Sequence, residues 1–153
     1  MMKRTAFTMI ELVFVIVILG ILAAVAIPKF AATRDDAQIT KGRSDVAAIR
    51  SAIVSERQGR LLQGNSAYIA ALDQGVAANT AGVVIFDDND NNLANGSLLQ
   101  YGITTADGNG HWMKASNTTY TYKIMGANNT FTYNSVNGTF LCTSGTHCSA
   151  LVN

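Results

Sequence analysis

An apolar run interrupted by one acid dominates the N-terminal part of the chain. From Leu12 to Ile27 the residues are Val, Ile, Leu, Phe and Ala with one Gly, and none carries a charge. Phe7 to Ile10 extend the run on the other side of Glu11. This length and composition predict a helix that spans a membrane once. A carboxylate at membrane depth is costly unless it is paired, so Glu11 is a candidate functional residue whose partner has to be found.

A secretory signal and a buried core helix are the alternatives for this run. A secretory signal has its small-residue cleavage site after the apolar core, whereas here Lys3, Arg4 and Ala6 all precede it. A core helix would need other apolar segments to surround it, and the remaining chain has too few. The basic end is expected to stay cytoplasmic, with everything after Ile27 outside.

A second helical pattern follows in residues 28–62. Pro28, the only proline, predicts a kink within a helix rather than its end. Apolar residues then recur on one face of an amphipathic helix, at Ile39, Val46, Ile49, Ile53 and Leu61. One helix from Thr8 to Leu62 would be roughly 80 Å long at ~1.5 Å per residue. A helix of that length needs a membrane or other helices around its first half.

The chain after Gly64 is rich in Asn, Gly, Thr and Ser and has the pattern of short strands. "TYTYKIM" (119–125) and "TFTYNSV" (130–136) alternate in polarity, and the pair Asn137–Gly138 separates the second from "TFLCT". Such a pair between two runs indicates a hairpin. We expect an α+β fold in which a three-stranded antiparallel meander packs on the apolar stripe of the helix. "GVVIFDD" (82–88) is either an edge strand or a buried turn.

Charge and composition exclude several classes of function. Charged residues make up 14% of 153 residues and the net charge is +1, which does not suit a general nucleic-acid binder. The sequence has two histidines and shows no recognisable nucleophile arrangement, phosphate-binding glycine loop or metal-ligand cluster. No enzymatic activity, metal or cofactor is predicted.

The basic residues are concentrated on the second helical segment. Residues 29–60 hold seven basic and four acidic side chains, whereas residues 61–153 hold two basic and five acidic ones. Arg43, Arg50 and Arg57 recur every seven residues on one stripe. That stripe is either a solvated face or a contact with acidic surfaces of neighbouring subunits.

Three features of the C-terminal part carry candidate chemistry. Cys142 and Cys148 match no common zinc spacing, and in an oxidising compartment a disulfide worth roughly 2 kcal/mol is favoured over free thiols or metal and redox chemistry. Asp88, Asp90 and Asn92 resemble the start of a calcium loop, but Leu93 and Leu99 stand where an EF-hand needs Gly and an acid, so a solvated turn is favoured. Trp112 is expected to be buried against the helix rather than exposed as a binding tip.

The stretch "AFTMIELVFVIVILGILAAVAIPKF" resembles the N-terminal signature of type IV pilins and of the pseudopilins of type II secretion systems. A short basic leader, a small residue, Phe7, the acid Glu11 and then Gly20 and Pro28 follow the family's spacing. The resemblance implies that a prepilin peptidase cuts between Ala6 and Phe7 and methylates the new amine of Phe7. The family usually has Gly before the cut. Since Ala6 is the smallest alternative, we expect cleavage to proceed, but more slowly.

The resemblance also supplies a partner for Glu11. The α-amine of Phe7 stays protonatable after methylation and would neutralise the carboxylate of a neighbouring subunit. A pair within one chain is less favourable, because Phe7 and Glu11 lie roughly 6 Å apart along a helix axis. The alternative is that Glu11 lies in the headgroup region near the cytoplasm.

These observations predict a filament subunit. Its parts would be a leader (1–6), a transmembrane and polymerisation segment (7–28), an amphipathic continuation (29–62) and a periplasmic head (63–153). Its partners would be other copies or related subunits, the prepilin peptidase, inner-membrane lipid, and an assembly platform with its ATPase; no nucleic acid is expected. The location would be the bacterial inner membrane and then a periplasmic or surface filament. The alternative is an anchored periplasmic binding module that never polymerises.

Overall fold

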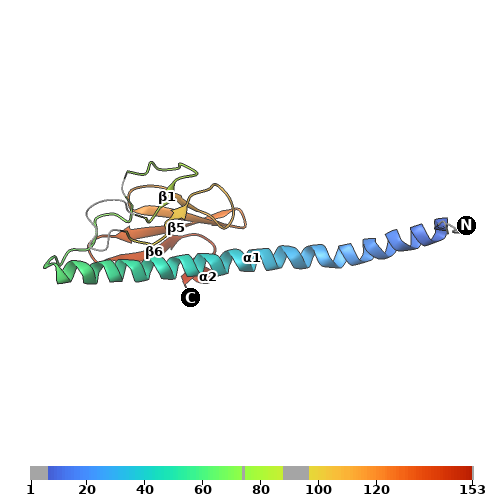
Figure 1. The fold of residues 1–153 in the computed structure, drawn as a ribbon, viewed down its shortest axis with the longest axis horizontal. Coiled ribbons are helices and arrows are strands. Elements are labelled where there is room, and N and C mark those ends of the chain that lie inside the picture. The colour runs from blue at the N-terminus through green and yellow to red at the C-terminus, as the bar shows by residue number, and fades with distance from the viewer. Residues whose placement is uncertain (1–6, 74, 88–96, 153) are drawn as a thin grey trace, which may run out of the picture. The chain divides into compact units, whose positions relative to one another are not determined.

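The computed structural model describes residues 7–73, 75–87 and 97–152, without the side chains of residues 31 and 32 (Figure 1). The chain divides into two compact units, Met1–Asp36 and Ala37–Asn153. Helix α1, Met9–Leu62, contributes to both and continues through Pro28, as predicted. Its C-terminal part, from Ala37 onward, belongs to the same unit as the strands, because it supplies one wall of their core.

Four antiparallel strands form the main sheet of the second unit, in the order β3-β4-β5-β6. They are β3 (Trp112–Lys114), β4 (Thr119–Ile124), β5 (Ala127–Asn134) and β6 (Thr139–Ser144). A separate two-stranded sheet pairs β1 (Val84–Ile85) with β2 (Ile103–Thr104), and helix α2 spans Cys148–Val152. The structure therefore confirms the predicted α+β class and the meander, and it adds β3 to the edge of that meander.

The two long hairpins of the sheet use different turns. Between β4 and β5, Met125 and Gly126 have φ of 49° and 78°, so the connection is a two-residue turn with both central residues left-handed, as in type I′. Between β5 and β6 the loop has four residues, 135–138, closed by a hydrogen bond of 2.8 Å from Gly138 N to Asn134 O. The hairpin expected at Asn137–Gly138 is confirmed, with a longer loop than the two-residue signal suggests.

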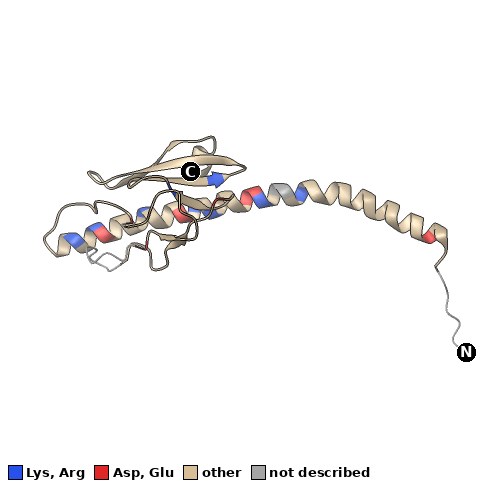
Figure 2. Cartoon of the chain, turned by 90° about the horizontal axis from the view of Figure 1, so that it is seen from above, with Lys and Arg blue, Asp and Glu red and all other residues tan. Residues whose placement is uncertain are grey.

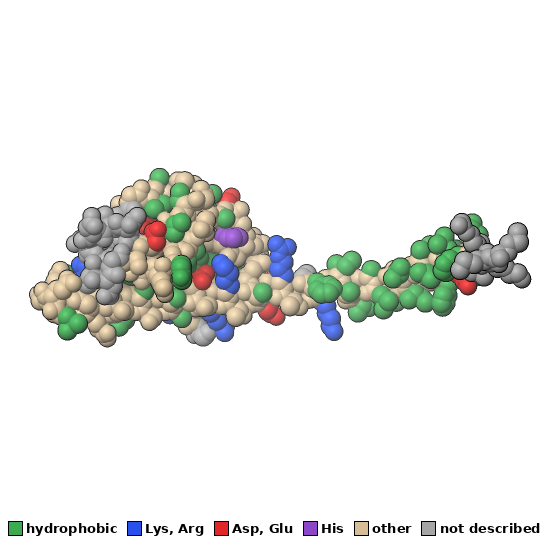
Figure 3. Space-filling view, viewed as in Figure 1, with side chains coloured by type: hydrophobic (Ala, Val, Ile, Leu, Met, Phe, Trp, Pro, Cys, Tyr) green, Lys and Arg blue, Asp and Glu red, His purple; other side chains and the backbone are tan. Residues whose placement is uncertain are grey.

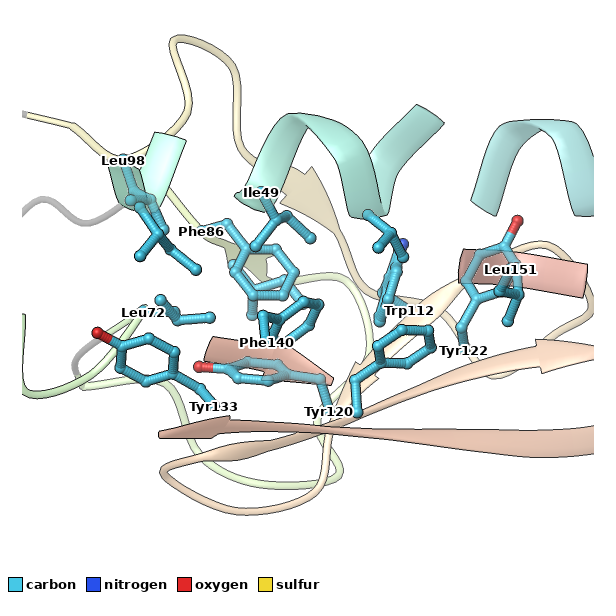
Figure 4. Close-up of a cluster of buried hydrophobic side chains, with 14 of the residues drawn as sticks. Ile49, Leu72, Phe86, Leu98, Trp112, Tyr120, Tyr122, Tyr133, Phe140 and Leu151 are labelled. Carbon is cyan, nitrogen blue, oxygen red and sulfur yellow. The ribbon is translucent and has the colours of Figure 1, made fainter. Parts of the chain in front are cut away.

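Alternate residues of the strands point toward α1 and form the core (Figure 4). The buried set from the sheet is aromatic to an unusual degree and contacts Val46, Ile49 and Ile53 of the helix; it includes Trp112, Tyr120, Tyr122, Phe131, Tyr133 and Phe140. Aromatic side chains bury large areas and gain from edge-to-face packing. Trp112 is fully buried, as expected, and its indole Nε1 donates to Asp45 Oδ2 at 2.9 Å.

The described part of the segment 82–88, up to Asp87, does not form an edge of the main sheet. Its strand β1 pairs with β2, and the following Phe86, with φ of 61°, turns its ring into the core beside Tyr120 (Figure 4). The two alternatives drawn from the sequence therefore both hold in part, because a two-residue strand is followed by a buried turn.

Leu61 does not belong to the inward face of α1, contrary to the sequence prediction. Its side chain is 49% exposed, whereas Glu56 and Arg60 are buried and paired, with 2.8 Å between Arg60 Nε and Glu56 Oε1. The reason is geometric: at 100° per residue, Arg60 lies about 20° from the direction of Ile53, but Leu61 lies about 80° away. A salt bridge continues the stripe where an apolar side chain was expected.

Candidate functional site

The N-terminal segment of α1 exposes its apolar side chains. Among the described residues, α1 is the one helix long and apolar enough to cross a membrane, and its apolar stretch is not buried within the chain. Large side chains along it are mostly solvent-accessible, including Ile10 at 75%, Leu22 at 60% and Phe30 at 74% (Figure 3). A contiguous apolar surface of this size marks a membrane or protein interaction site.

Glu11 has a partner within its own chain that the sequence reasoning missed. Its carboxylate Oε2 accepts hydrogen bonds from Thr8 N at 2.8 Å and Thr8 Oγ1 at 2.7 Å, and Glu11 N donates to Thr8 Oγ1 at 3.4 Å. This is a capping box, in which the side chains of the N-cap residue and of the residue three positions later satisfy each other's backbone groups. The signal was the T-x-x-E spacing in "TMIE". The carboxylate is therefore hydrogen-bonded before any neighbour is present.

The remaining predicted residues of the N-terminal signature are placed as follows. Phe7 is 85% exposed, so no other part of the described chain covers it. Around Gly20 nothing lies within 4 Å of the position that a Cβ would take, and Pro28 lies inside α1. Ala6 falls outside the described residues. Peptidase cleavage, methylation of Phe7 and pairing of Glu11 between subunits remain predictions.

The charged residues of α1 between positions 44 and 62, whose places along the helix Figure 2 shows, are buried or only partly exposed, and three of them contact the head. Asp45 accepts a hydrogen bond from the Trp112 indole, and Arg50 Nε donates one to Phe140 O at 3.0 Å. Arg57 donates a hydrogen bond to Ser66 O, and its guanidinium lies 4.2 Å from the centre of the Tyr68 ring. Arg43 Nε likewise donates to Ala150 O. The arginine stripe thus binds carbonyls of its own head, a role that the sequence did not reveal, while Arg43 stays exposed to solvent.

The outward face of the same stretch is uncharged. Every exposed residue from position 44 to 62 is small, apolar or amide-bearing: Ser44, Ala47, Ala48, Ser51, Val54, Ser55, Gln58, Leu61 and Leu62. A helix on a protein surface ordinarily directs charged residues to solvent and apolar ones to the core. Here the charges face inward, which leaves a charge-free surface that we call the outward face of α1.

Cys142 and Cys148 form the predicted disulfide, with their Cα atoms 5.6 Å apart. The loop that they close is held by the buried Asn129, whose Oδ1 accepts a hydrogen bond of 2.8 Å from His147 N and whose Nδ2 donates to Tyr122 O at 3.2 Å. No group of three or more His, Cys, Asp or Glu in the described part of the chain could hold a metal. Asp88, Asp90 and Asn92, the calcium alternative, lie outside the described residues.

A buried ion pair in the head carried no signal in the sequence. Lys114 Nζ lies 2.6 Å from Asp73 Oδ1, and both side chains are almost completely excluded from solvent. Burial raises the pKa of the Asp73 carboxyl, and the Lys114 ammonium offsets part of that rise. The pair ties the segment after α1 to strand β3, which gives it a structural role.

Comparisons with known proteins concern mainly the N-terminal part. Residues 1–27 match the family model described as the prokaryotic N-terminal methylation motif. The chain is 41% identical over 51 residues to the type II secretion system core protein G of Pseudomonas aeruginosa, covering 33% of this chain and 36% of that protein. It is 47% identical over 51 residues to the type IV narrow pilus major component of Thermus thermophilus, covering 33% and 44%.

A fimbrial protein of Pseudomonas aeruginosa gives 42% identity over 55 residues, covering 36% of each chain. These alignments span less than half the length of the curated relatives. No solved structure matches this chain. The resemblance to pilins and pseudopilins is thus confirmed, and the architecture of a long N-terminal helix with an antiparallel sheet is pilin-like.

Proposed function

We propose that this chain is a structural subunit of a type IV pilus-like filament or of a type II secretion pseudopilus. The observation that carries the proposal is the exposed apolar segment of α1 within a methylation motif, residues 1–27. In the membrane that segment would be covered by lipid, and in a filament by the same segment of other subunits. The head would face the periplasm and then the filament surface.

Processing precedes assembly in this proposal. A prepilin peptidase removes residues 1–6, and methylation of the Phe7 amine follows; an inner-membrane platform with its ATPase then lifts the subunit into the filament. The described geometry is compatible with this order, because Phe7 is exposed and helix α1 begins at Met9, after the expected cut. Glu11, capped by Thr8 at first, would exchange this partner in part for the Phe7 amine of a neighbour.

The outward face of α1 gives a second line of support. Exposed charges on this stretch would have to be desolvated when subunits pack side by side, at a cost of several kcal/mol for each unpaired ion. The chain avoids this cost because the charges between positions 44 and 62 are used within the chain: Arg50 and Arg57 bind carbonyls of the head, and Glu56 pairs with Arg60. A charge-free helix face with small residues also lets another helix approach closely.

The test is the intact mass of the membrane-extracted protein, with sequencing of its N-terminal fragment, in cells with and without the peptidase. The proposal expects a chain that begins at N-methyl-Phe7 only where the peptidase is present. An uncut chain beginning at Met1 in both strains would contradict it. In that case the anchored periplasmic binding module, which keeps its leader and never polymerises, becomes the better description.

A further inference from the structure

A hollow of about 450 Å³ lies on the sheet face opposite the aromatic core. Met113 of β3 and Thr121 of β4 contribute to its lining, as do residues of the segments 79–81 and 106–111. All of its lining residues are described and belong to the second compact unit. The volume lies within the range of small-ligand sites, roughly 300–1,000 Å³.

Hydrogen bonds fix the walls of this hollow. Gly110 N donates to Lys123 O at 2.7 Å, and Gly126 N donates to Asn109 Oδ1 at 2.8 Å, so the 106–111 segment is tied to β4 and to the following turn. The opposite wall is held by a bond of 2.8 Å from Asn79 N to Lys114 O. The hollow is therefore formed before any ligand arrives, which lowers the entropic cost of binding.

The polar groups around the hollow come as adjacent donors and acceptors. Lys123 Nζ lies 2.9 Å from Asp107 Oδ1, so an ammonium with further N–H groups stands beside a carboxylate with a further lone-pair oxygen. The Asn79 and Asn128 amides and the His111 imidazole line the same space, and each can both donate and accept. A hydroxyl group also does both, so neighbouring hydroxyls match this set.

The remaining properties of the hollow restrict the ligand. The charges of Lys123 and Asp107 cancel, which removes the attraction that an anion would need. Its lining includes no Phe, Tyr or Trp side chain, and its one aromatic ring is the small imidazole of His111, so an extended flat ligand would find little stacking surface. Met113, Ala81 and Ala115 supply an apolar surface for C–H groups. These features suit a ligand with a neutral, hydroxyl-rich edge and an apolar face.

We propose that this hollow binds one or two sugar units of a neutral carbohydrate. At one side of the hollow, a sugar hydroxyl would bridge Asp107 and Lys123. Other hydroxyls would bond to the amide of Asn128 and to the imidazole of His111, while C–H groups of the sugar ring contact Met113. The proposal does not depend on filament formation, because every residue in it belongs to the head of a single chain.

Saturation-transfer NMR on the full chain in a detergent without sugar groups tests the proposal. The probes are glucose, galactose, mannose and N-acetylglucosamine, with a neutral tripeptide for comparison. We expect at least one sugar to give a saturable signal. In the variants His111→Ala and Asn128→Ala its affinity should fall about fivefold each, the loss of one hydrogen bond.

The matched controls are His147→Ala and Asn117→Ala, which remove the same residue types outside this hollow and should leave the affinity unchanged. A sugar signal that persists undiminished in His111→Ala and Asn128→Ala would overturn the site. Failure of all four sugars to give a saturable signal would overturn the ligand class, as would transfer to the tripeptide alone. The N-terminal processing experiment is unaffected by either outcome, so the two proposals fail separately.

Discussion

Glu11 can be bound by Thr8 of its own chain or by the amine of a neighbour, and substitutions separate the two. Glu11→Gln keeps an oxygen that accepts from Thr8 but removes the charge, whereas Thr8→Val keeps the charge and removes the side-chain part of the cap. If pairing between subunits sets filament register, Glu11→Gln should reduce surface filaments at least tenfold, measured by shearing and quantitative immunoblotting. Thr8→Val should retain most of them.

A reversed result, with Thr8→Val defective and Glu11→Gln normal, would assign Glu11 to helix capping alone. Both variants should reach the membrane in wild-type amounts, which fractionation checks.

The buried pair of Lys114 and Asp73 should contribute more to head stability than the exposed pair of Lys123 and Asp107. Lys114→Met leaves the Asp73 carboxylate buried without its ion-pair partner, at a cost of about 3–5 kcal/mol in the free energy of unfolding. The matched control is Lys123→Met, whose partner Asp107 is 79% exposed and whose pair is worth at most about 1 kcal/mol. Denaturant unfolding followed by near-UV circular dichroism measures both. Equal losses of unfolding free energy in the two variants would contradict the larger contribution of the buried pair.

At the scale of secondary-structure elements, Gly42 is a contact point between α1 and the rest of the head. A Cβ there would lie 2.5 Å from both Leu151 Cδ2 and Tyr122 Cε1. Gly42→Ala gains about 1 kcal/mol of helix propensity, but overpacking of this kind costs about 1–3 kcal/mol. We expect a net loss of head stability in thermal unfolding. Gly20→Ala, where nothing lies within 4 Å, should leave the head unchanged.

The outward face of α1 predicts a defect in assembly without a defect in folding. Ser51→Lys places a charge on this exposed face, so the monomer should unfold at the wild-type temperature while filaments are lost because the ammonium must be desolvated. Leu141→Lys, on an exposed position of β6, is the control. Electron microscopy of sheared filaments gives the readout. Normal filaments from Ser51→Lys would mean that the outward face of α1 stays in solvent in the filament, which contradicts the prediction.

The sequence predicted the elements with strong periodicity and missed those set by tertiary contacts. The long helix, three strands and the disulfide were all visible. Strand β3 was not, because three residues after a glycine-rich loop show no period. The Met125–Gly126 turn was also missed, since Met is not a residue that favours a left-handed conformation and only the pairing of Ile124 with Ala127 requires it there.

The contacts of the charged side chains of α1 were also missed, because they too depend on tertiary structure. Arg50 and Arg57 were assigned to solvent or to neighbouring subunits because charge usually marks a surface. Their partners are backbone carbonyls whose positions depend on the folded head, so no spacing in the sequence reveals them. The donor and acceptor groups of the carbohydrate hollow come from segments up to 49 positions apart, Asn79 to Asn128, and were likewise invisible.

For the molecule as a whole, the tyrosine-rich core predicts alkaline unfolding. Burial raises the pKa of Tyr122 and of Tyr133 from 10.0 to about 12. The folded state therefore holds these protons more tightly, so its stability is fully present below pH 10 and is lost as the pH rises through 12. Tyrosinate absorbance and near-UV circular dichroism should change together in this window. Ionisation of both tyrosines near pH 10 with the fold intact would contradict it.

Asn129 has a consequence for the order of events during maturation. This amide belongs to β5 and holds His147, so the loop that carries Cys148 is brought toward Cys142 by noncovalent contacts of the folded sheet. Oxidation then closes a ring whose ends already lie close together. The reduced chain should accordingly reach a near-native head before any oxidase acts on it, so a filament subunit of the proposed kind would not have to wait for thiol oxidation before assembly.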